Sequence, residues 1–158
     1  MSPSNLSRRA FLAASTTTAV ALSGFAAPNK ARVVPKKVSP NETINVAAIG
    51  AGGKGWADIN GCLTNGVNFV GLADPDWNRA GEAFYKLPDA KQFKDYRDML
   101  ESMPEIDAVT ISTPDHTHAP AAYMAMNLGK HVYVQKPLTH TIAEARLLTN
   151  TAKENGVV

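Results

Sequence analysis

Residues 44–55 read INVAAIGAGGKG, an apolar run that leads directly into a glycine-rich turn. Because residues 44–49 are nearly all apolar, they predict a strand buried on both faces, as in a parallel sheet. A helix is predicted from Gly55 to Leu63. The pattern G-x-G-x-x-G falls on Gly50, Gly52 and Gly55. Between a buried strand and a helix, this pattern is typical of a turn that binds the pyrophosphate of a dinucleotide.

Each glycine of this turn has an expected task. Gly50 turns the chain sharply off the strand, and Gly52, beside Gly53, leaves room for phosphate to approach the backbone. Gly55 lets the helix pack close to the sheet, and the free N–H groups at the helix N-terminus attract phosphate. A Walker A loop is excluded because Trp56, not lysine, follows Gly55. A methyltransferase nucleotide site shares this strand–turn–helix logic and remains an alternative.

An acidic residue ends the second predicted strand, which spans residues 67–73. Asp74 lies 19 positions after Gly55, near the spacing of a carboxylate that accepts from the adenosine ribose hydroxyls. A carboxylate there repels a 2′-phosphate, so NAD is the expected cofactor and NADP is less favoured. Arg79 works against this preference, since it is placed to reach a 2′-phosphate or to stack on adenine.

The rest of the chain alternates short apolar runs with amphipathic segments, which predicts a doubly wound parallel sheet in a Rossmann-type α/β fold. Thr141 and Glu144 form a capping box at the start of the last helix, and Gly129 ends the helix before it. The expected elements are a helix over 77–87, a strand over 91–93, a helix capped by Asp95 to 102, a strand over 108–112, a helix over 119–128, a strand over 131–134, a helix over 142–155 and the start of a sixth strand at 156–158.

A second group of polar residues follows the fourth and fifth strands, in the segments 112–118 and 135–137. In an open parallel sheet the ligand lies at the carboxyl ends of the strands, so both segments are expected beside the glycine turn. Lys136 is placed to donate to a sugar or ribose hydroxyl, or to assist proton transfer, although a solvated loop lysine is the alternative. We expect helix capping by Thr117 or His118, or contact with the nicotinamide end. Asp115, His116 and His118 are too few to indicate a metal site.

The first residues differ in character from the rest. Arg8 and Arg9 precede a short, weakly apolar run to residue 27, which is typical of a twin-arginine export signal and predicts a periplasmic or exported protein. Residues 28–43 are interpreted as a linker, and residues 44–158 as the globular domain. The net charge is +2, with much of the basic excess ahead of residue 40, so neither nucleic acid nor a membrane beyond export is expected as a partner. The single cysteine, Cys62, excludes an internal disulfide.

The sequence resembles the N-terminal domain of the glucose–fructose oxidoreductase/inositol dehydrogenase (Gfo/Idh/MocA) family, in its exported subgroup. The resemblance covers residues 44–158 and rests on several separated motifs in family order. These are the turn at 48–55, Ala73-Asp74-Pro75-Asp76, Lys94-Asp95-Tyr96-Arg97, Ile106-Asp107-Ala108-Val109, the loop at 113–118 and the segment 129–137.

The resemblance implies NAD(P)-dependent redox chemistry on sugars, inositols or related polyols. It places Lys136, from a Glu-Lys-Pro motif, near the nicotinamide and the substrate, and assigns Thr113, Pro114 and His118 to the cofactor loop. Two positions depart from the family pattern: Asp115 replaces asparagine, and Gln135 replaces the usual glutamate beside Lys136. Family members also have a C-terminal substrate domain that supplies most of the homo-oligomer contact, which predicts that this sequence is a fragment without turnover.

Three functions therefore stand as hypotheses. The first is the cofactor half of an exported sugar or polyol oxidoreductase. The second is a glycosidase that works by transient oxidation with tightly held NAD. The third is a dinucleotide-binding module without catalysis.

Overall fold

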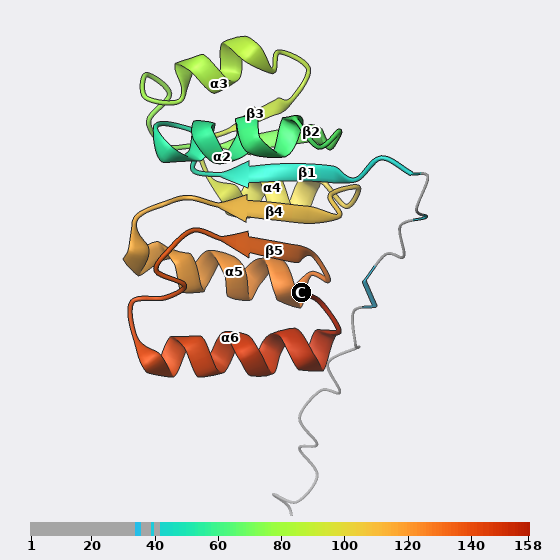
Figure 1. The fold of residues 1–158 in the computed structure, drawn as a ribbon, viewed down its shortest axis with the longest axis vertical. Coiled ribbons are helices and arrows are strands. Elements are labelled where there is room, and N and C mark those ends of the chain that lie inside the picture. Colours follow the sequence, from blue (N-terminus) through green and yellow to red (C-terminus); the bar gives the residue numbers. More distant parts are fainter. Residues whose placement is uncertain (1–33, 36–38, 40–41) are drawn as a thin grey trace, which may run out of the picture. The chain divides into compact units, whose positions relative to one another are not determined.

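The computed structural model describes residues 34, 35, 39 and 42–158. Within them, five strands form one sheet in the order β3-β2-β1-β4-β5 (Figure 1), and every neighbouring pair is parallel. The chain runs outward from β1 in both directions, so β1 and β4 flank the point where the strand order reverses. The prediction of a doubly wound α/β fold is confirmed. The strands are β1 (Asn45–Ile49), β2 (Asn68–Ala73), β3 (Lys91–Phe93), β4 (Ala108–Ile111) and β5 (His131–Val134).

Alternation along β1 divides the core between the two faces of the sheet. Val46 and Ala48 belong to the core on one face, while Ala47 and Ile49 belong to the core on the other. The first core is completed by α2 (Lys54–Leu63) and α3 (Gly81–Lys86), and the second by α4 (Tyr96–Ser102), α5 (His118–Asn127) and α6 (Ile142–Asn155). In Figure 1, α2 accordingly lies in front of the sheet and α4 behind it.

Burial on both faces holds for the inner strands but not for the edges. Each residue of β1 after Asn45 is buried, as is each residue of β4 after Ala108. None of the residues of β3 or β5 is fully buried. The expectation drawn from apolar runs was therefore right where strands have neighbours on both sides.

The helix expected over residues 77–87 begins later in the structure. Residues 77–80 form turns, and α3 starts only at Gly81. The Asp76 carboxylate accepts from the backbone N–H groups of Asn78 and Arg79, both at 3.1 Å. These are the bonds of an N-cap, and the Ala80 N–H also donates to the Asp76 carbonyl at 3.0 Å, so residues 77–80 form one capped turn ahead of the regular helix. A short 3₁₀ helix over Asp115–Thr117 likewise precedes α5.

Two of the expected helix starts, those of α4 and α6, are confirmed by their caps. Asp95 accepts from the backbone N–H of Arg97 at 2.9 Å at the start of α4. Thr141 and Glu144 form the reciprocal capping box of α6, with bonds of 2.8 and 3.2 Å. Beyond α6, the Val158 carbonyl accepts from the Val132 N–H at 2.8 Å. That N–H points away from β4, so Val158 lies at the outer edge of β5.

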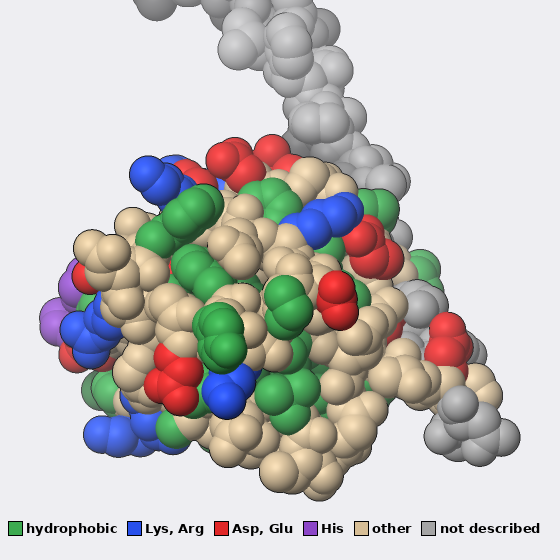
Figure 2. All heavy atoms as spheres, turned by 90° about the horizontal axis from the view of Figure 1, so that it is seen from above, with side chains coloured by type: hydrophobic (Ala, Val, Ile, Leu, Met, Phe, Trp, Pro, Cys, Tyr) green, Lys and Arg blue, Asp and Glu red, His purple; other side chains and the backbone are tan. Residues whose placement is uncertain are grey.

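The predicted export signal at residues 1–27 lies outside the described residues, as does most of the linker at 28–43. No helix among the residues that the structure describes is long and apolar enough to cross a membrane. Figure 2 shows acidic and basic side chains interspersed on the described part of the face that it views.

Candidate dinucleotide-binding site

The backbone of the turn between β1 and α2 requires glycine at several positions. Gly50 has φ +84°, and a Cβ there would lie 2.9 Å from the carbonyl carbon and oxygen of Ser112. Gly53 has φ +57° and precedes the first residue of α2. A Cβ on Gly55 would overlap the carbonyl oxygen of Gly50. The turn is thus held closely between β1, α2 and the end of β4.

Gly52 is constrained by a neighbour that the sequence did not indicate. A Cβ on Gly52 would lie 2.8 Å from both the Cγ atom and the carbonyl oxygen of Arg79. The expectation was that glycine here makes room for phosphate. The structure adds a second reason, because the turn packs directly against the loop that follows Asp76. Arg79 is thereby held over the glycine turn, at the edge of the cleft described below.

Asp74 is nearly buried and joins the end of β2 to the glycine turn. Its Oδ2 atom accepts from the N–H groups of Ala51 and Gly52 at 2.9 and 3.1 Å, and its Oδ1 atom accepts from the N–H of Asp76 at 2.9 Å. A carboxylate has about four acceptor positions, so Oδ1 retains one for a ligand hydroxyl. Asp74 therefore sets the shape of the turn while it faces the cleft.

A cleft of about 770 Å³ opens along the carboxyl ends of the strands, within the usual range for small-molecule sites. The glycine turn lies between its two halves. The half beside β2 and β3 includes Asp74, Arg79, Lys94, Asp95, Tyr96 and Arg97; the half beside β4 includes Ser112, Thr113, Pro114 and Thr117. The residues at 94–97 were quoted in the family resemblance but not predicted as cofactor residues. Their position after the third strand is the signal that places them at this edge.

The β3 side of the cleft carries a strong ion pair. Arg97 binds the Asp95 carboxylate through Nε and Nη2, at 2.9 and 2.5 Å. Hydrogen bonds from the Arg97 side chain and backbone lower the pKa of Asp95 from 3.8 to about 2. Lys94 lies 5.6 Å from the ring centroid of Trp77, within the range of a cation–π contact. This side is therefore rich in groups that can face ribose and adenine.

On the β4 side, Thr113 offers an unused polar atom. Its Oγ1 is buried and has no hydrogen-bond partner among the described residues, although Thr113 lines the cleft. A buried hydroxyl without a partner is costly, so it is suited to a polar ligand that completes its bonding. Thr113 and Pro114 thus lie where the sequence placed them.

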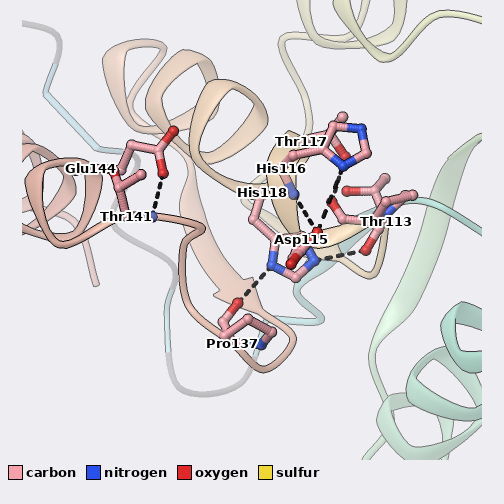
Figure 3. Close-up of polar contacts among 9 residues, drawn as sticks. Thr113, Asp115, His116, Thr117, His118, Pro137, Thr141 and Glu144 are labelled. Carbon is pink, nitrogen blue, oxygen red and sulfur yellow. Dashed lines mark hydrogen bonds and ion pairs between the residues drawn. The ribbon is translucent and has the colours of Figure 1, made fainter.

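His118 has a different position from the one expected. Its side chain is 1% exposed and is not part of the cleft lining. Nδ1 lies 2.7 Å from the carbonyl oxygen of Pro137, and Nε2 lies 2.8 Å from that of Thr113 (Figure 3). A neutral ring has one N–H and can donate to only one of these carbonyls at a time. His118 therefore joins two loops, and its ring does not line the cleft.

The neighbouring acidic and histidine side chains do not converge. Asp115 and His116 pair at 3.6 Å on the surface, while the His118 ring is directed inward. Within the part of the chain that the structure describes, no three His, Cys, Asp or Glu side chains are grouped to hold a metal ion.

Lys136 follows β5 at the same edge of the sheet and is exposed, but it is not part of the cleft lining. Its backbone N–H donates to the Oε1 atom of Gln135 at 2.9 Å. The structure therefore places Lys136 after β5 and outside the cleft lining, with its backbone N–H bonded to the Gln135 side chain.

A polar cluster centred on Asp58 was missed by the sequence analysis. Asp58 lies on α2, and its side chain is 8% exposed. It pairs with Lys54 one helical turn earlier, and its Oδ2 accepts from Ser112 Oγ at 2.7 Å and from Gln135 Nε2 at 2.8 Å. Burial raises the pKa of Asp58, but the hydrogen bonds from Lys54, Gln135 and Ser112 outweigh this and lower it overall. The hydrogen bond between Lys54 and Asp58 raises the pKa of Lys54.

Residues 44–158 match the model of the oxidoreductase family with the NAD-binding Rossmann fold. The chain belongs to this family. It is 33% identical to the scyllo-inositol 2-dehydrogenase (NAD(+)) of Bacillus subtilis over 117 residues, 73% of this chain and 34% of that protein. It is 31% identical to a glycosyl hydrolase family 109 protein of Shewanella pealeana over 170 residues, 94% of this chain and 37% of that protein.

Among solved structures, GenD2 from gentamicin A biosynthesis in complex with NAD superposes with a TM-score of 0.69 at 27% identity. The match covers 79% of this chain and 36% of that one. The chain thus spans about a third of the length of the relatives that it matches. This third contains the family's NAD-binding domain.

The geometry of the residues in this chain also fits a bound dinucleotide. Gly50, Gly52 and Gly55 let the turn pack against Ser112, Arg79 and its own backbone, and Gly50 and Gly52 line the cleft as a cradle of main chain without side chains. The α2 N-terminus adjoins this cradle, so its free N–H groups face the place of the pyrophosphate. Asp74 lies on one side of the cradle and the unpartnered Thr113 hydroxyl on the other.

Proposed function

We propose that the whole protein is an NAD-dependent oxidoreductase that acts on a sugar, an inositol or a related polyol. Residues 44–158 are its cofactor half, and a further domain supplies the substrate pocket and the contacts of a homo-oligomer. The observation that carries the cofactor assignment is the Asp74 carboxylate, held beside the glycine turn and facing the cleft. The relationship to a scyllo-inositol dehydrogenase supports the substrate class.

In this proposal the chain's own residues divide the cofactor between the two halves of the cleft. Asp74 accepts from the adenosine ribose, the α2 N-terminus binds the pyrophosphate, and Arg79 covers the turn. Thr113 and Pro114 line the nicotinamide half, and Lys136 lies beside it. When bound, the nicotinamide supplies the acceptor for the two electrons and hydrogen removed from a substrate alcohol.

Calorimetric titration of the purified chain with NAD⁺ and NADP⁺ tests the cofactor assignment. We expect NAD⁺ to bind at least about tenfold more tightly, because the Asp74 carboxylate repels a 2′-phosphate. Asp74→Asn keeps an acceptor oxygen but removes the charge, so this variant should narrow the difference. The exposed Glu101, on α4, gives a control in Glu101→Gln. Equal or tighter binding of NADP⁺ by the unmodified chain would contradict the assignment.

A second candidate function is a glycosidase that uses tightly held NAD for transient oxidation. The specific observation is the alignment with the glycosyl hydrolase family 109 protein, which covers 94% of this chain. Residues 44–158 are less than three quarters of the chain, so that alignment extends into the first 43 residues. Copurification of NAD with the protein, and release of a sugar without net NADH formation, would favour the glycosidase. Net NADH formation on a free polyol would favour the dehydrogenase.

We also propose that the protein is exported through the twin-arginine pathway to the periplasm or beyond. Support comes from Arg8 and Arg9 ahead of the weakly apolar run at residues 10–27. Fusion of residues 1–43 to a reporter that is active only outside the cytoplasm tests this. Arg8→Lys combined with Arg9→Lys should abolish export, and a reporter exported equally well by that variant would contradict the proposal.

A further inference from the structure

The Asp58 cluster connects three segments that are far apart in the sequence. Asp58 belongs to α2, which follows the glycine turn, while Ser112 follows β4 and Gln135 follows β5. Both of the latter side chains donate to the same oxygen, Oδ2, at 2.7 and 2.8 Å. The cluster therefore fixes the ends of β4 and β5 relative to the helix that begins at the pyrophosphate cradle.

The orientation of the Gln135 amide is determined by chemistry. An ionised Asp58 only accepts, so the amide nitrogen must face it. The amide oxygen then faces the backbone N–H of Lys136, which donates to it at 2.9 Å. Both contacts require the same orientation, so each end of the Gln135 amide has a partner. A carboxylate at position 135 would instead place two like charges about 3 Å apart, and one of them would have to take a proton.

The strand order identifies which half of the dinucleotide lies near this cluster. Asp74, at the end of β2, faces the adenosine ribose, and the glycine turn at β1 holds the pyrophosphate. β4 and β5 lie on the opposite side of β1 from β2, so the nicotinamide half extends toward them. Ser112 and Lys54 both belong to the cluster and also line the cleft there.

We propose that Asp58 is a positioning residue for the nicotinamide half of the cofactor, and that Gln135 is an amide because Asp58 is a carboxylate. The proposal rests on the dinucleotide binding described above. Asp58 acts through Ser112, which faces the cleft, and through Gln135, which holds the backbone of Lys136. The adenosine half depends on Asp74 and on the loop after β3, and neither of these belongs to the cluster.

Two ligands separate positioning from general stability. NADH contains the nicotinamide and fluoresces from it, whereas ADP contains only the adenosine and the two phosphates. For Gln135→Glu we expect the affinity for NADH to fall by about tenfold, with reduced fluorescence enhancement, and the affinity for ADP to stay within about twofold. Equal losses for both ligands would show a merely structural role and would overturn the proposal, as would unchanged NADH binding.

Exchanging the carboxylate and the amide between positions 58 and 135 tests whether NADH affinity can be restored. In the double variant Asp58→Asn with Gln135→Glu, an amide again faces a carboxylate, and that carboxylate can still accept from the Lys136 N–H. We expect this variant to recover NADH affinity to within about threefold of the unmodified chain, a coupling that double-mutant cycles detect. Losses that simply add would overturn the matched-pair assignment.

Controls keep folding and cofactor binding apart from the proposal. Unfolding midpoints are measured for every variant, and Glu101→Gln provides an exposed carboxylate outside the cluster. Should Gln135→Glu fail to fold, Gln135→Met removes both polar contacts without adding charge, and the same loss for NADH alone is expected. If the unmodified chain bound neither NADH nor ADP, the proposed cofactor function itself would fail. If it bound both and the cluster variants changed neither, only the positioning role would fail.

Discussion

Replacing three glycines by alanine, one at a time, separates the two constraints on the turn after β1. Gly50 has φ +84°, and a Cβ there would lie 2.9 Å from the Ser112 backbone. Gly66 has φ +75° but has no atom within 4 Å of such a Cβ. Gly61 lies within α2, without a positive φ, and is equally open. An alanine at position 50 would therefore meet both backbone strain and a steric clash. An alanine at position 66 would meet strain alone, and one at position 61 would meet neither.

The expected changes in the free energy of unfolding follow from this comparison. Gly61→Ala should stabilise the chain by about 0.5–1 kcal/mol, since alanine favours the helix and restricts the unfolded state. Gly66→Ala should cost about 1–2 kcal/mol, the usual penalty for a non-glycine residue in the left-handed region. Gly50→Ala adds to this strain a contact with backbone atoms that cannot rotate away, worth about 1–3 kcal/mol. Its total cost is therefore about 2–5 kcal/mol, a large part of the stability of a domain of this size.

Equilibrium unfolding in urea, followed by far-UV circular dichroism, measures all three variants against the unmodified chain. The ligand-free chain is used, so that loss of cofactor binding does not enter the result. We expect the order of stability Gly61→Ala, unmodified, Gly66→Ala, Gly50→Ala, with unchanged dependence on denaturant. A Gly50→Ala variant as stable as Gly66→Ala would refute the close approach of the turn to β4.

Further predictions concern the capping box, the Asp95–Arg97 ion pair and Gly52. Thr141→Ala should destabilise the chain by about 1 kcal/mol in urea unfolding, because the cap of α6 is lost; an unchanged midpoint would contradict the reciprocal bonds. The pKa of Asp95 is lowered from 3.8 to about 2, so its ion pair stabilises the fold above about pH 4 and this contribution is lost toward about pH 2. Asp95→Asn should therefore be less stable than the unmodified chain at neutral pH, with a gap that narrows over that range; a constant gap would argue against the pair. Gly52→Ala should lower both NAD⁺ affinity and stability, because its Cβ meets the Arg79 carbonyl as well as the phosphate site; normal stability with reduced affinity would mean that only the phosphate is crowded.

The elements that the sequence predicted well are those whose signals are local. The strand over 91–93 and the strand over 131–134 have the expected bounds, and the caps at Asp95 and Thr141 lie where they were placed. Residues 77–80 were assigned to a helix. Asp76 caps the turn that these residues form, but the regular helix begins only at Gly81. The capping aspartate was visible in the sequence, but the short extent of its turn was not.

The orientation of the His118 side chain could not be predicted from the sequence for a different reason. A histidine in a loop at the carboxyl edge of the sheet lies where ligands bind in folds of this kind. Whether the ring faces the cleft or the interior depends on the path of a second loop, which ends β5 and is remote in the sequence. The Pro137 carbonyl comes within 2.7 Å of Nδ1 and directs the ring inward. Position in the chain therefore placed this residue at the correct edge but could not decide what it contacts.

Asp74 and Asp58 show the same limit of sequence-based prediction, because only one of these two carboxylates was found. Asp74 was found because strand, turn and helix follow one another, and a fixed spacing then assigns the carboxylate to the adenosine ribose. Asp58 and Gln135 lie 77 positions apart, and no spacing rule joins a helix face to the end of a strand that is two neighbours away in the sheet. The sequence carried only an indirect sign, namely Gln135 where the family resemblance predicts glutamate. With Asp58 in place, an amide at position 135 donates to that carboxylate and accepts from the Lys136 N–H, whereas a carboxylate there would face a like charge.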